Sequence, residues 1–247
     1  MLTVDDVTFL YRENRGVASV SFNVKAGECV GVIGENGVGK STLLGLLAAA
    51  LLPQFGTIQL TTDAHKGRVR RYHTHLGIGY RRHVGYLTEL GPAYEEMSVF
   101  RYLRVRACLR GERFLRIRRR VNEAMERCGL TEMRDERIGR LSQGIRRRVA
   151  LAEAILTMPQ ILILDDPFAG IDAKMRADFV KIIKAIQPTS HVIISGHDRA
   201  LLAACCSRFI LLQKDTPGVV EMTPQEANAI LNDTPPTTKE QTKGATK

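Results

Sequence analysis

The chain has 247 residues, 44% of them apolar and 25% charged, as expected of a soluble globular protein with a sizeable core. The longest apolar run, Leu43 to Leu52, is about half of the ~20 residues that span a bilayer, and we expect no secretory signal in the acidic N-terminal stretch. A formal net charge of +10 calls for a polyanionic partner or neighbour: nucleic acid, nucleotide phosphates or an anionic membrane surface.

Five cysteines are scattered along the chain without the spacing of metal ligands, at positions 29, 108, 128, 205 and 206. We expect reduced thiols in a cytoplasmic protein. The adjacent pair Cys205 and Cys206 is predicted to fill a buried helix face, with a redox element as the alternative.

Short apolar runs predict strands at 3–11, 17–24, 28–34, 56–60, 83–89, 161–165, 191–195 and 209–213. Helical periodicity lies between them at 117–128, at 144–157 and again around Phe179 to Ile186. Strands that alternate with helices predict an α/β fold with a mainly parallel sheet, and the closely spaced early strands predict an antiparallel β side layer.

The chain is predicted to form one domain at 1–231, into which an arginine-rich helical subdomain is inserted at about 95–158. Nine arginines and one acid, Glu112, lie between Arg101 and Arg120. A solvated helix face is one interpretation of such a run, although solvated faces usually mix charges of both signs. The stretch 232–247 lacks aromatic residues and apolar periodicity, so we expect a disordered tail.

The stretch "GENGVGKST" follows a predicted strand, precedes a helical run and contains the P-loop pattern. Its glycines let backbone N–H groups point at phosphate oxygens, Lys40 reaches the terminal phosphates as a catalytic residue, and Ser41 binds Mg²⁺. The start of the helix adds the positive end of its dipole. The predicted nucleotide-binding residues are Gly34, Glu35, Asn36, Gly37, Val38, Gly39, Lys40, Ser41 and Thr42.

The predicted strand "ILIL" ends in two adjacent carboxylates, Asp165 and Asp166. Beside a P-loop, Asp165 is predicted to hold Mg²⁺ together with Ser41. A turn that closes a core strand is the alternative interpretation of these acids. The predicted cofactors are therefore ATP and Mg²⁺.

With these motifs in order, residues 1–222 resemble the ATP-binding cassette (ABC) ATPases, which are built on a P-loop NTPase core. The most discriminating segment is "LSQGIRRRVALAEAIL" from Leu141, which resembles the family signature LSGGQ and its helix. In the family this segment contacts the γ-phosphate of ATP held by a second subunit. The resemblance implies that role for Ser142, Gln143 and Gly144.

The resemblance implies three further site residues. His197 in "SGHD" matches the switch histidine, which contacts the γ-phosphate, and Tyr11 stands where the family stacks an aromatic ring on adenine. Glu89 occupies the position of the glutamine that contacts the metal-bound water, so it is predicted to bind both nucleotide and metal. Ile145 replaces the last residue of the signature. These departures, together with the segment "YEEMSVFRYL", resemble the exporter branch, which serves gliding motility or the export of polysaccharide, lipid or drugs and works with separate membrane subunits.

Asp166 stands where the family has a catalytic glutamate that polarises the attacking water. The missing methylene withdraws the carboxylate by roughly 1.5 Å, and a misplacement of about 1 Å can cost ~10²-fold in rate. We therefore expect a slow ATPase, or one half of a heterodimer whose second site is faster. Homodimer and heterodimer both remain open.

The favoured function is the ATPase subunit of a membrane transporter, which drives export by ATP-dependent dimer closure. It would lie on the cytoplasmic face of the membrane, where the arginine-rich helices meet anionic lipid or a membrane subunit. An ABC-type ATPase acting on nucleic acid is the less favoured alternative, and a non-hydrolysing scaffold is the third. The insert at 63–83, with His73 and His75, is predicted to be a solvated surface loop rather than a metal site.

Overall fold

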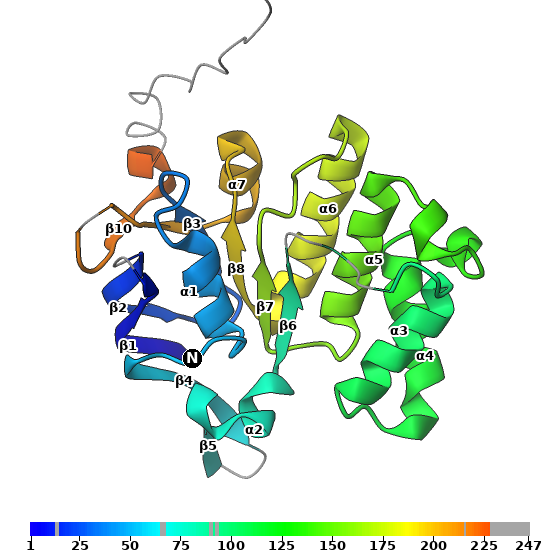
Figure 1. Ribbon diagram of the computed structural model, residues 1–247, viewed down its shortest axis with the longest axis horizontal. Coiled ribbons are helices and arrows are strands. Elements are labelled where there is room, and N and C mark those ends of the chain that lie inside the picture. The colour runs from blue at the N-terminus through cyan, green and yellow to red at the C-terminus, as the bar shows by residue number, and fades with distance from the viewer. Residues whose placement is uncertain (13–14, 65–67, 89–90, 92–93, 215, 228–247) are drawn as a thin grey trace, which may run out of the picture.

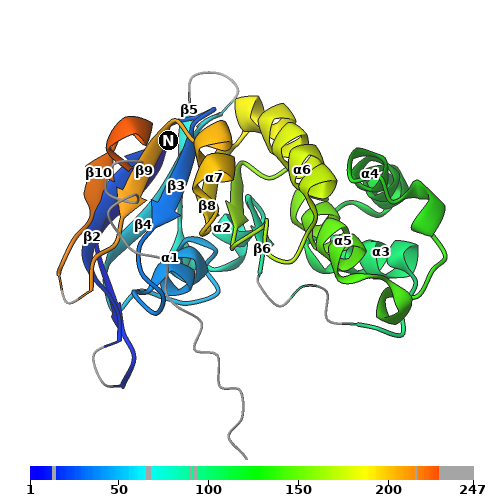
Figure 2. The ribbon, with the colours of Figure 1, turned by 90° about the horizontal axis from the view of Figure 1, so that it is seen from above.

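The computed structural model describes residues 1–227 apart from 13–14, 65–67, 89–90, 92–93 and 215. The predictions for Glu89 and for the tail at 232–247 therefore concern residues outside the described ranges. Two sheets, the helix between them and a group of helices on the far side form the layers of the fold (Figure 1, Figure 2).

The larger sheet has six strands in the described part of the chain, in the order β10-β9-β3-β8-β7-β6. All neighbouring strands are parallel except β9 and β10. Every residue of β3, β7 and β8 is buried, as expected where both faces of a parallel sheet are covered. The prediction of a mainly parallel sheet is confirmed. The bounds are β3 Cys29–Ile33, β6 Val84–Leu87, β7 Ile161–Leu164, β8 His191–Ser195, β9 Arg208–Leu211 and β10 Val220–Met222.

The smaller sheet is antiparallel, with the order β2-β1-β4-β5, and it confirms the predicted side layer. Helix α1 (Lys40–Leu47) packs against both sheets: its leucines share one core with Val4 and Ile58 of the smaller sheet and Ile193 of the larger. The strands of the smaller sheet are β1 Leu2–Leu10, β2 Gly16–Val24, β4 Phe55–Ala64 and β5 Arg68–His73.

Five helices of the described chain lie on the other side of the larger sheet, and the two at 99–109 and 114–127 pack against the helix at 143–155. Alternate residues of β7 explain this division, because Leu162 and Leu164 belong to the core under these helices while Ile161 and Ile163 belong to the core around α1. No helix in the described ranges has the length and apolar character that a membrane span requires. The five helices are α3 Val99–Leu109, α4 Phe114–Arg127, α5 Gln143–Ile155, α6 Ala173–Ile186 and α7 Arg199–Cys205.

Helices α3 and α5 are joined by a buried carboxylate, Glu153. It accepts a hydrogen bond from Arg106 Nε at 2.7 Å, forms an ion pair with Arg110 at 3.6 Å and accepts a hydrogen bond from the Tyr102 hydroxyl. Two of the nine clustered arginines thus serve the interior of the helical region. Only the other, more exposed arginines of this run are therefore left to contact a partner.

The insert at 63–83 is not the solvated loop that its composition predicts. It contains β5, a short 3₁₀ helix at Thr74–Leu76 and α2 at Ile78–Arg81. Tyr80 is fully buried, and its hydroxyl donates to the Leu47 carbonyl at 2.8 Å, while Arg81 Nε donates to the Ala49 carbonyl at 3.1 Å. The prediction was wrong because one apolar anchor among many arginines and histidines leaves no periodic pattern.

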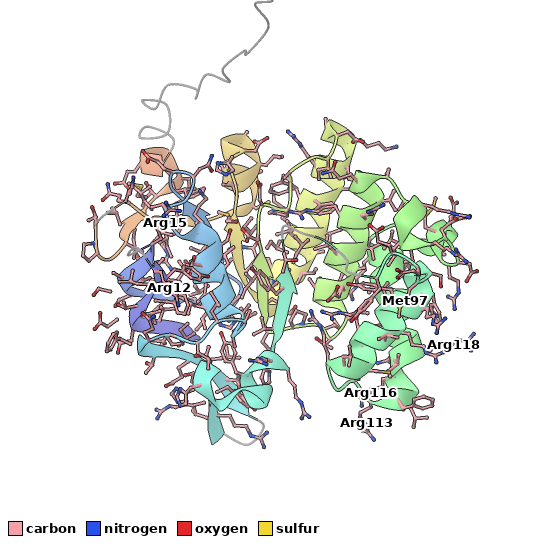
Figure 3. All side chains as sticks on the ribbon, in the orientation of Figure 1. Arg12, Arg15, Met97, Arg113, Arg116 and Arg118 are labelled. Carbon is pink, nitrogen blue, oxygen red and sulfur yellow. The ribbon has the colours of Figure 1, made fainter. Side chains whose placement is uncertain are left out.

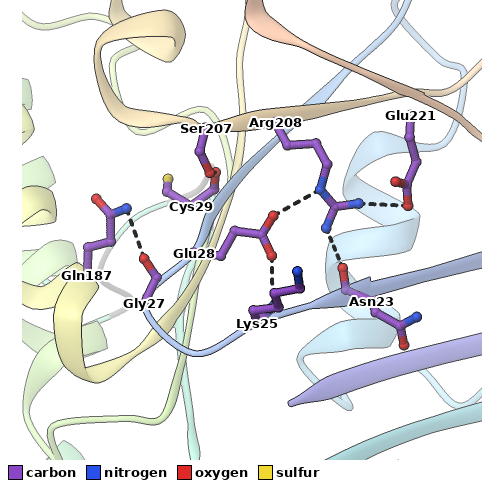
Figure 4. A network of polar contacts seen from close by, with 9 residues as sticks. All are labelled: Asn23, Lys25, Gly27, Glu28, Cys29, Gln187, Ser207, Arg208 and Glu221. Atoms are coloured by element: carbon purple, nitrogen blue, oxygen red, sulfur yellow. Dashed lines mark hydrogen bonds and ion pairs between the residues drawn. The ribbon is translucent and has the colours of Figure 1, made fainter.

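A polar network at one edge joins the two sheets (Figure 4). Arg208 on β9 pairs with Glu28 at 2.9 Å and with Glu221 on β10 at 2.7 Å, and it also donates to the Asn23 carbonyl on β2. Glu28 also accepts a hydrogen bond from the Lys25 N–H at 2.8 Å. Burial opposes ionisation of Glu28, but these hydrogen bonds and the nearby cations lower its pKa below the ordinary value.

All five cysteines are free thiols. Cys205 and Cys206 are both buried, which agrees with the predicted filling of a helix face, and Cys206 Sγ lies 3.6 Å from Cys29 Sγ. Burial raises the pKa of the Cys205 thiol to about 12. Both facts describe unreactive core thiols.

Candidate functional site

The site lies where three neighbouring parallel strands end. β3 leads into the loop at 34–39, β7 ends before Asp165 and Asp166, and β8 ends at Ser195, followed by His197. Because parallel strands present their carboxyl ends at one edge, these segments meet there. They enclose a cavity of about 400 Å³ lined by Tyr11, Arg15, Gly16, Asn36, Gly37, Gly39, Lys40, Ser41, Thr42, Asp165, Asp166, Ser195, Gly196 and His197.

The loop at 34–39 wraps around the Lys40 ammonium group. Lys40 Nζ donates to the carbonyls of Gly34 and Glu35, both at 2.8 Å. Gly39 has φ 106°, and a Cβ there would lie 2.5 Å from the Gly16 carbonyl oxygen, so the loop needs glycine at this position. Burial lowers the pKa of Lys40, while Asp165 and Asp166 oppose that shift.

Ser195 organises the two acids. Its hydroxyl donates to Asp165 Oδ1 at 2.6 Å and accepts a hydrogen bond from the Asp166 N–H at 3.0 Å. Ser195 is only 1% exposed and Asp165 is also buried. One serine at the end of β8 thus holds the side chain of the first acid and the backbone of the second.

Asp166 has a left-handed backbone with φ 43°. Aspartate is among the few residues enriched in this region. Its Oδ1 lies 3.4 Å from the place where a Cβ on Gly196 would stand, so Gly196 leaves room for the carboxylate. Asp166 and the neighbouring His197 both line the cavity.

Tyr11 lines the cavity and is 49% exposed. Its ring meets Phe9 edge to face with the ring centroids 4.9 Å apart, and its N–H donates to the Arg15 carbonyl at 2.7 Å. The exposed ring face is available to a flat partner.

The signature residues lie elsewhere. Ser142 caps helix α5 by accepting from the Ile145 N–H at 3.4 Å, and Ser142 and Gln143 are exposed. Gly144 packs under Met175, whose Sδ would lie 2.8 Å from a Cβ at this position. None of these three residues is among those that line the cavity in the described part of the chain.

The site residues predicted from the sequence therefore fall into three groups. The first group lines the cavity: Tyr11, Asn36, Gly37, Gly39, Lys40, Ser41, Thr42 and Asp165, together with the predicted catalytic Asp166 and His197. In the second group, Gly34 and Glu35 contact Lys40 through their carbonyls, and Val38 is buried behind the loop. Ser142, Gln143 and Gly144 stand apart as the third group, and Glu89 lies outside the described residues.

Four cavity residues were not predicted: Arg15, Gly16, Ser195 and Gly196. The position of Ser195 at the end of an apolar strand was a usable signal, because parallel strand ends gather at one edge. For Arg15 and Gly16 the sequence carries no such signal, since their approach depends on how β2 packs beside the loop.

The lining fits a nucleoside triphosphate with a magnesium ion. Gly37 has φ 80°, and a Cβ at this residue would meet no heavy atom within 4 Å, so its backbone is open for close approach. Ser41 and Asp165 offer the oxygen ligands that Mg²⁺ prefers, and Lys40 offers a cation for phosphate. The described residues contain no group of three or more His, Cys, Asp or Glu placed to hold a metal ion, so a magnesium ion here would also need ligands from phosphate and water.

Comparison with known proteins decides the family. Residues 17–169 match the family described as "ABC transporter". The lipopolysaccharide export system ATP-binding protein LptB of Escherichia coli is 32% identical over 215 residues, which cover 86% of this chain and 87% of LptB. The chain belongs to the ABC transporter ATP-binding family. This match and this identity show that the chain is an ATP-binding protein of the ABC transporter family and has the ABC fold.

Other ABC relatives differ in the roles that their names state. The uncharacterized ABC transporter ATP-binding protein YxlF of Bacillus subtilis is 30% identical over 86% of this chain and 68% of its own length. The sulfate/thiosulfate import protein CysA of Synechococcus elongatus is 32% identical over 80% of this chain, which spans 56% of CysA. Export and import thus both occur among the relatives.

Solved structures agree with the ABC fold. The "ATP binding subunit of ABC transporter" has a TM-score of 0.79 and 25% identity, over 94% of this chain and 93% of that chain. The dimeric ABC transporter cassette MJ0796 has a TM-score of 0.76 and 21% identity, over 91% of this chain and 99% of the other. The α/β fold with its side layer is therefore that of an ABC cassette.

Proposed function

We propose that this ABC cassette binds ATP with Mg²⁺ in the cavity at the strand ends and hydrolyses it to power transport through separate membrane subunits. The observation that supports this most directly is the convergence of Lys40, Asp165, Asp166 and His197 on one cavity from three neighbouring strands. If any one of these residues only formed a structural turn, its position beside the other three in one cavity would have no explanation.

Each residue has a distinct proposed role in binding. The backbone N–H groups of the loop at 34–39 and the Lys40 ammonium bind the phosphates. The Ser41 hydroxyl and Asp165 hold Mg²⁺, which draws charge from the phosphate oxygens when bound. Ser195 keeps Asp165 oriented for that task through its 2.6 Å hydrogen bond. Tyr11 supplies the exposed ring on which the base stacks.

Asp166 is the proposed acceptor of a proton from the attacking water, and His197 is proposed to contact the terminal phosphate beside it. The left-handed backbone of Asp166 directs its short side chain into the cavity. Aspartate still reaches less far than glutamate by roughly one C–C bond of about 1.5 Å. We therefore propose slow hydrolysis, or a second, faster site in a heterodimer.

Two cassettes are proposed to close over the nucleotides. Ser142 and Gln143 are exposed at the N-terminus of a 13-residue helix and do not line the cavity at the strand ends. Free N–H groups at such a terminus bind anions. The serine loop of one copy would then complete the phosphate site of the other, and the similarity of fold to the dimeric cassette MJ0796 supports this arrangement.

We propose that transport runs in the direction of export, because the segment "YEEMSVFRYL" and the changed signature resemble the exporter branch. The chain would then lie on the cytoplasmic face of the membrane. The domain at 1–231 would dock its helical subdomain, about 95–158, against the membrane subunits. The relatives named for export and for import leave the direction to experiment.

Anionic lipid contact is proposed for the tip of α4. Phe114 is 83% exposed and Leu115 is 87% exposed. Arg113, Arg116 and Arg118 project from the same end of the molecule (Figure 3), and their guanidinium groups form no ion pair with an acid in the described ranges. An exposed apolar pair beside arginines favours a lipid surface over nucleic acid, for which phosphate contacts alone suffice.

A nucleotide-binding experiment tests the core of the proposal. Wild-type protein should retain ATP only with Mg²⁺ present, and Lys40→Ala should weaken binding by about tenfold or more. Lys184→Ala removes an exposed lysine outside the cavity and serves as the matched control. Failure of the folded wild-type protein to bind ATP would remove the basis of the proposed function.

The proposed contact of the protein with anionic lipid is tested separately, by sedimentation with vesicles that contain such lipid. The Phe114→Ser, Leu115→Ser double variant should lose vesicle binding and keep ATP binding. Retained vesicle binding by the variant, or preferred binding to DNA or RNA over vesicles, contradicts the lipid contact.

A further inference from the structure

Arg147 lies inside the protein on α5 and is only 6% exposed. Its Nη1 donates to the Thr88 carbonyl at 3.0 Å, and its Nη2 donates to the carbonyls of Asp165, at 2.9 Å, and of Asp166. Its Nε lies 3.5 Å from the Pro167 carbonyl oxygen. One buried guanidinium thus joins α5 to the ends of β6 and β7.

These contacts hold Asp166 from one side while Ser195 holds it from the other. The Asp166 N–H donates to Ser195 Oγ at 3.0 Å, and the Asp166 carbonyl accepts from Arg147. Both peptide groups that flank the Asp166 Cα are therefore fixed, at φ 43°. Because the two peptide planes set the direction of the Cα–Cβ bond, they also set where the short carboxylate enters the cavity.

The chemistry of the contact requires arginine in particular. A buried cation is costly unless hydrogen bonds satisfy it, and the planar fork of five N–H donors can reach several carbonyls at once. A lysine ammonium is a compact point charge on a flexible stem and cannot reproduce that fork. The adjacent arginines bind elsewhere: Arg146 pairs with Glu95 at 2.7 Å and Arg148 pairs with Asp178 at 2.9 Å.

We propose that Arg147 is a positioning residue for hydrolysis: it fixes the backbone of Asp166 so that the carboxylate meets the water, and it ties that backbone to the helix that begins at the serine loop. Movement of α5 when the second copy closes is then transmitted to Asp166 through one side chain. This inference rests on the proposed ATPase function, and it adds a residue that touches neither nucleotide nor metal.

The proposal is tested by measuring the rate constant for ATP cleavage in variants that have equal melting temperatures. Arg147→Met should lower the single-turnover rate constant for ATP cleavage by about 10- to 100-fold, the cost of misplacing a reacting group by about 1 Å. Its dissociation constant for ATP should stay within about threefold of wild type, because Lys40, Ser41 and Asp165 are left in place. Arg147→Lys keeps the charge, should lose less activity, and is measured as well in case Arg147→Met does not fold.

Arg148→Met is the matched control, because Arg148 is also largely buried and bonded, to the Cys128 carbonyl at 3.1 Å and to Asp178, but it does not contact Asp166. At equal melting temperature this control should keep the wild-type cleavage rate constant. Equal losses in the Arg147 and Arg148 variants would reduce Arg147 to a stabilising residue and overturn the proposal.

A double-mutant cycle with Asp166→Asn gives the decisive readout. If Arg147 acts by positioning the Asp166 carboxylate, Arg147→Met should change the residual cleavage rate of the Asp166→Asn protein by less than about twofold. A full additional loss in that background overturns the proposal, as does a wild-type rate in the single variant. Wild-type protein that binds no ATP would instead refute the proposed function, so the two failures are distinguishable.

Discussion

Asp166 provides the sharpest test of the proposed chemistry, through substitution by asparagine and by glutamate. Asparagine has the same shape and also tolerates the left-handed backbone at φ 43°, so the fold and ATP affinity should change little. A general base contributes about 10²- to 10⁴-fold, or about 2.7–5.5 kcal/mol of barrier. Asp166→Asn should therefore slow single-turnover cleavage by that factor.

Asp166→Glu should act in the opposite direction. It extends the carboxylate by about 1.5 Å and should raise the cleavage rate constant by about 10- to 100-fold if reach limits the reaction. Glutamate fits the left-handed backbone less well, at a cost of about 1–2 kcal/mol, which corresponds to a melting temperature lower by about 2–8 °C in a chain of this size.

The assay is cleavage of radiolabelled ATP by excess enzyme, with the dissociation constant for ATP and the melting temperature measured in parallel. Gain in the glutamate variant together with loss in the asparagine variant supports Asp166 as the base. If glutamate gives no gain and asparagine gives no loss, Asp166 is not the base and the reasoning about its reach fails.

Three further predictions concern groups around the site and the core. Ser195→Ala removes two hydrogen bonds and should lower the free energy of unfolding by about 1–3 kcal/mol and weaken binding of ATP with Mg²⁺, measured by denaturation and calorimetry; unchanged magnesium dependence would contradict its role. Glu153→Gln leaves buried Arg110 without its carboxylate and should lower the free energy of unfolding by about 2–3 kcal/mol, because partial exposure reduces the about 3–5 kcal/mol of a fully buried pair. Each kcal/mol corresponds to about 2–4 °C in melting temperature, so a variant that melts within about 2 °C of wild type would refute this prediction. Because the pKa of Glu28 is lowered beside Arg208, its carboxylate contributes to the free energy of unfolding above pH 4.5, and this contribution is lost as the pH falls through the pKa of the folded state. In Glu28→Gln the free energy of unfolding should therefore fall less steeply with decreasing pH below 4.5. The same pH dependence in wild type and variant would contradict this prediction.

The parts of the site that follow from the sequence are those written in consecutive residues. The loop at 34–39, Lys40 and the pair Asp165 and Asp166 each carry their geometry in a local motif, because a strand end followed by glycines or acids has few arrangements. The residues meet as predicted at the strand ends. Their roles in binding and catalysis remain predictions.

Contacts between distant segments could not be predicted in the same way. Ser195 meets Asp165 only because β8 lies next to β7, and nothing near residue 195 specifies that neighbour. Arg147 is the middle of three consecutive arginines, and the rotation of α5 against β7 decides which of the three reaches the carbonyls at the end of that strand. Sequence patterns report one face of a helix well, but they do not report which single side chain reaches a carbonyl across it.

The elements missed by the sequence analysis have similar causes. β5 lies in a stretch dominated by arginine and histidine, where no alternation of apolar and polar residues is visible. β10 has three residues, too few to establish a period. In both cases the hydrogen bonds of a neighbouring strand stabilise an extended segment that its own composition does not favour.

The buried Tyr80 gives the basic insert a function in the architecture whatever its surface contacts. Its hydroxyl and the Arg81 guanidinium supply donors to carbonyls at the far end of the helix that starts at Lys40. Carbonyls at a helix C-terminus have no partner within the helix, and a cation there is favourable. Trimming the insert to make a minimal cassette would leave that helix end exposed, so an engineer who shortens this chain should keep the tyrosine and arginine or rebuild the missing caps.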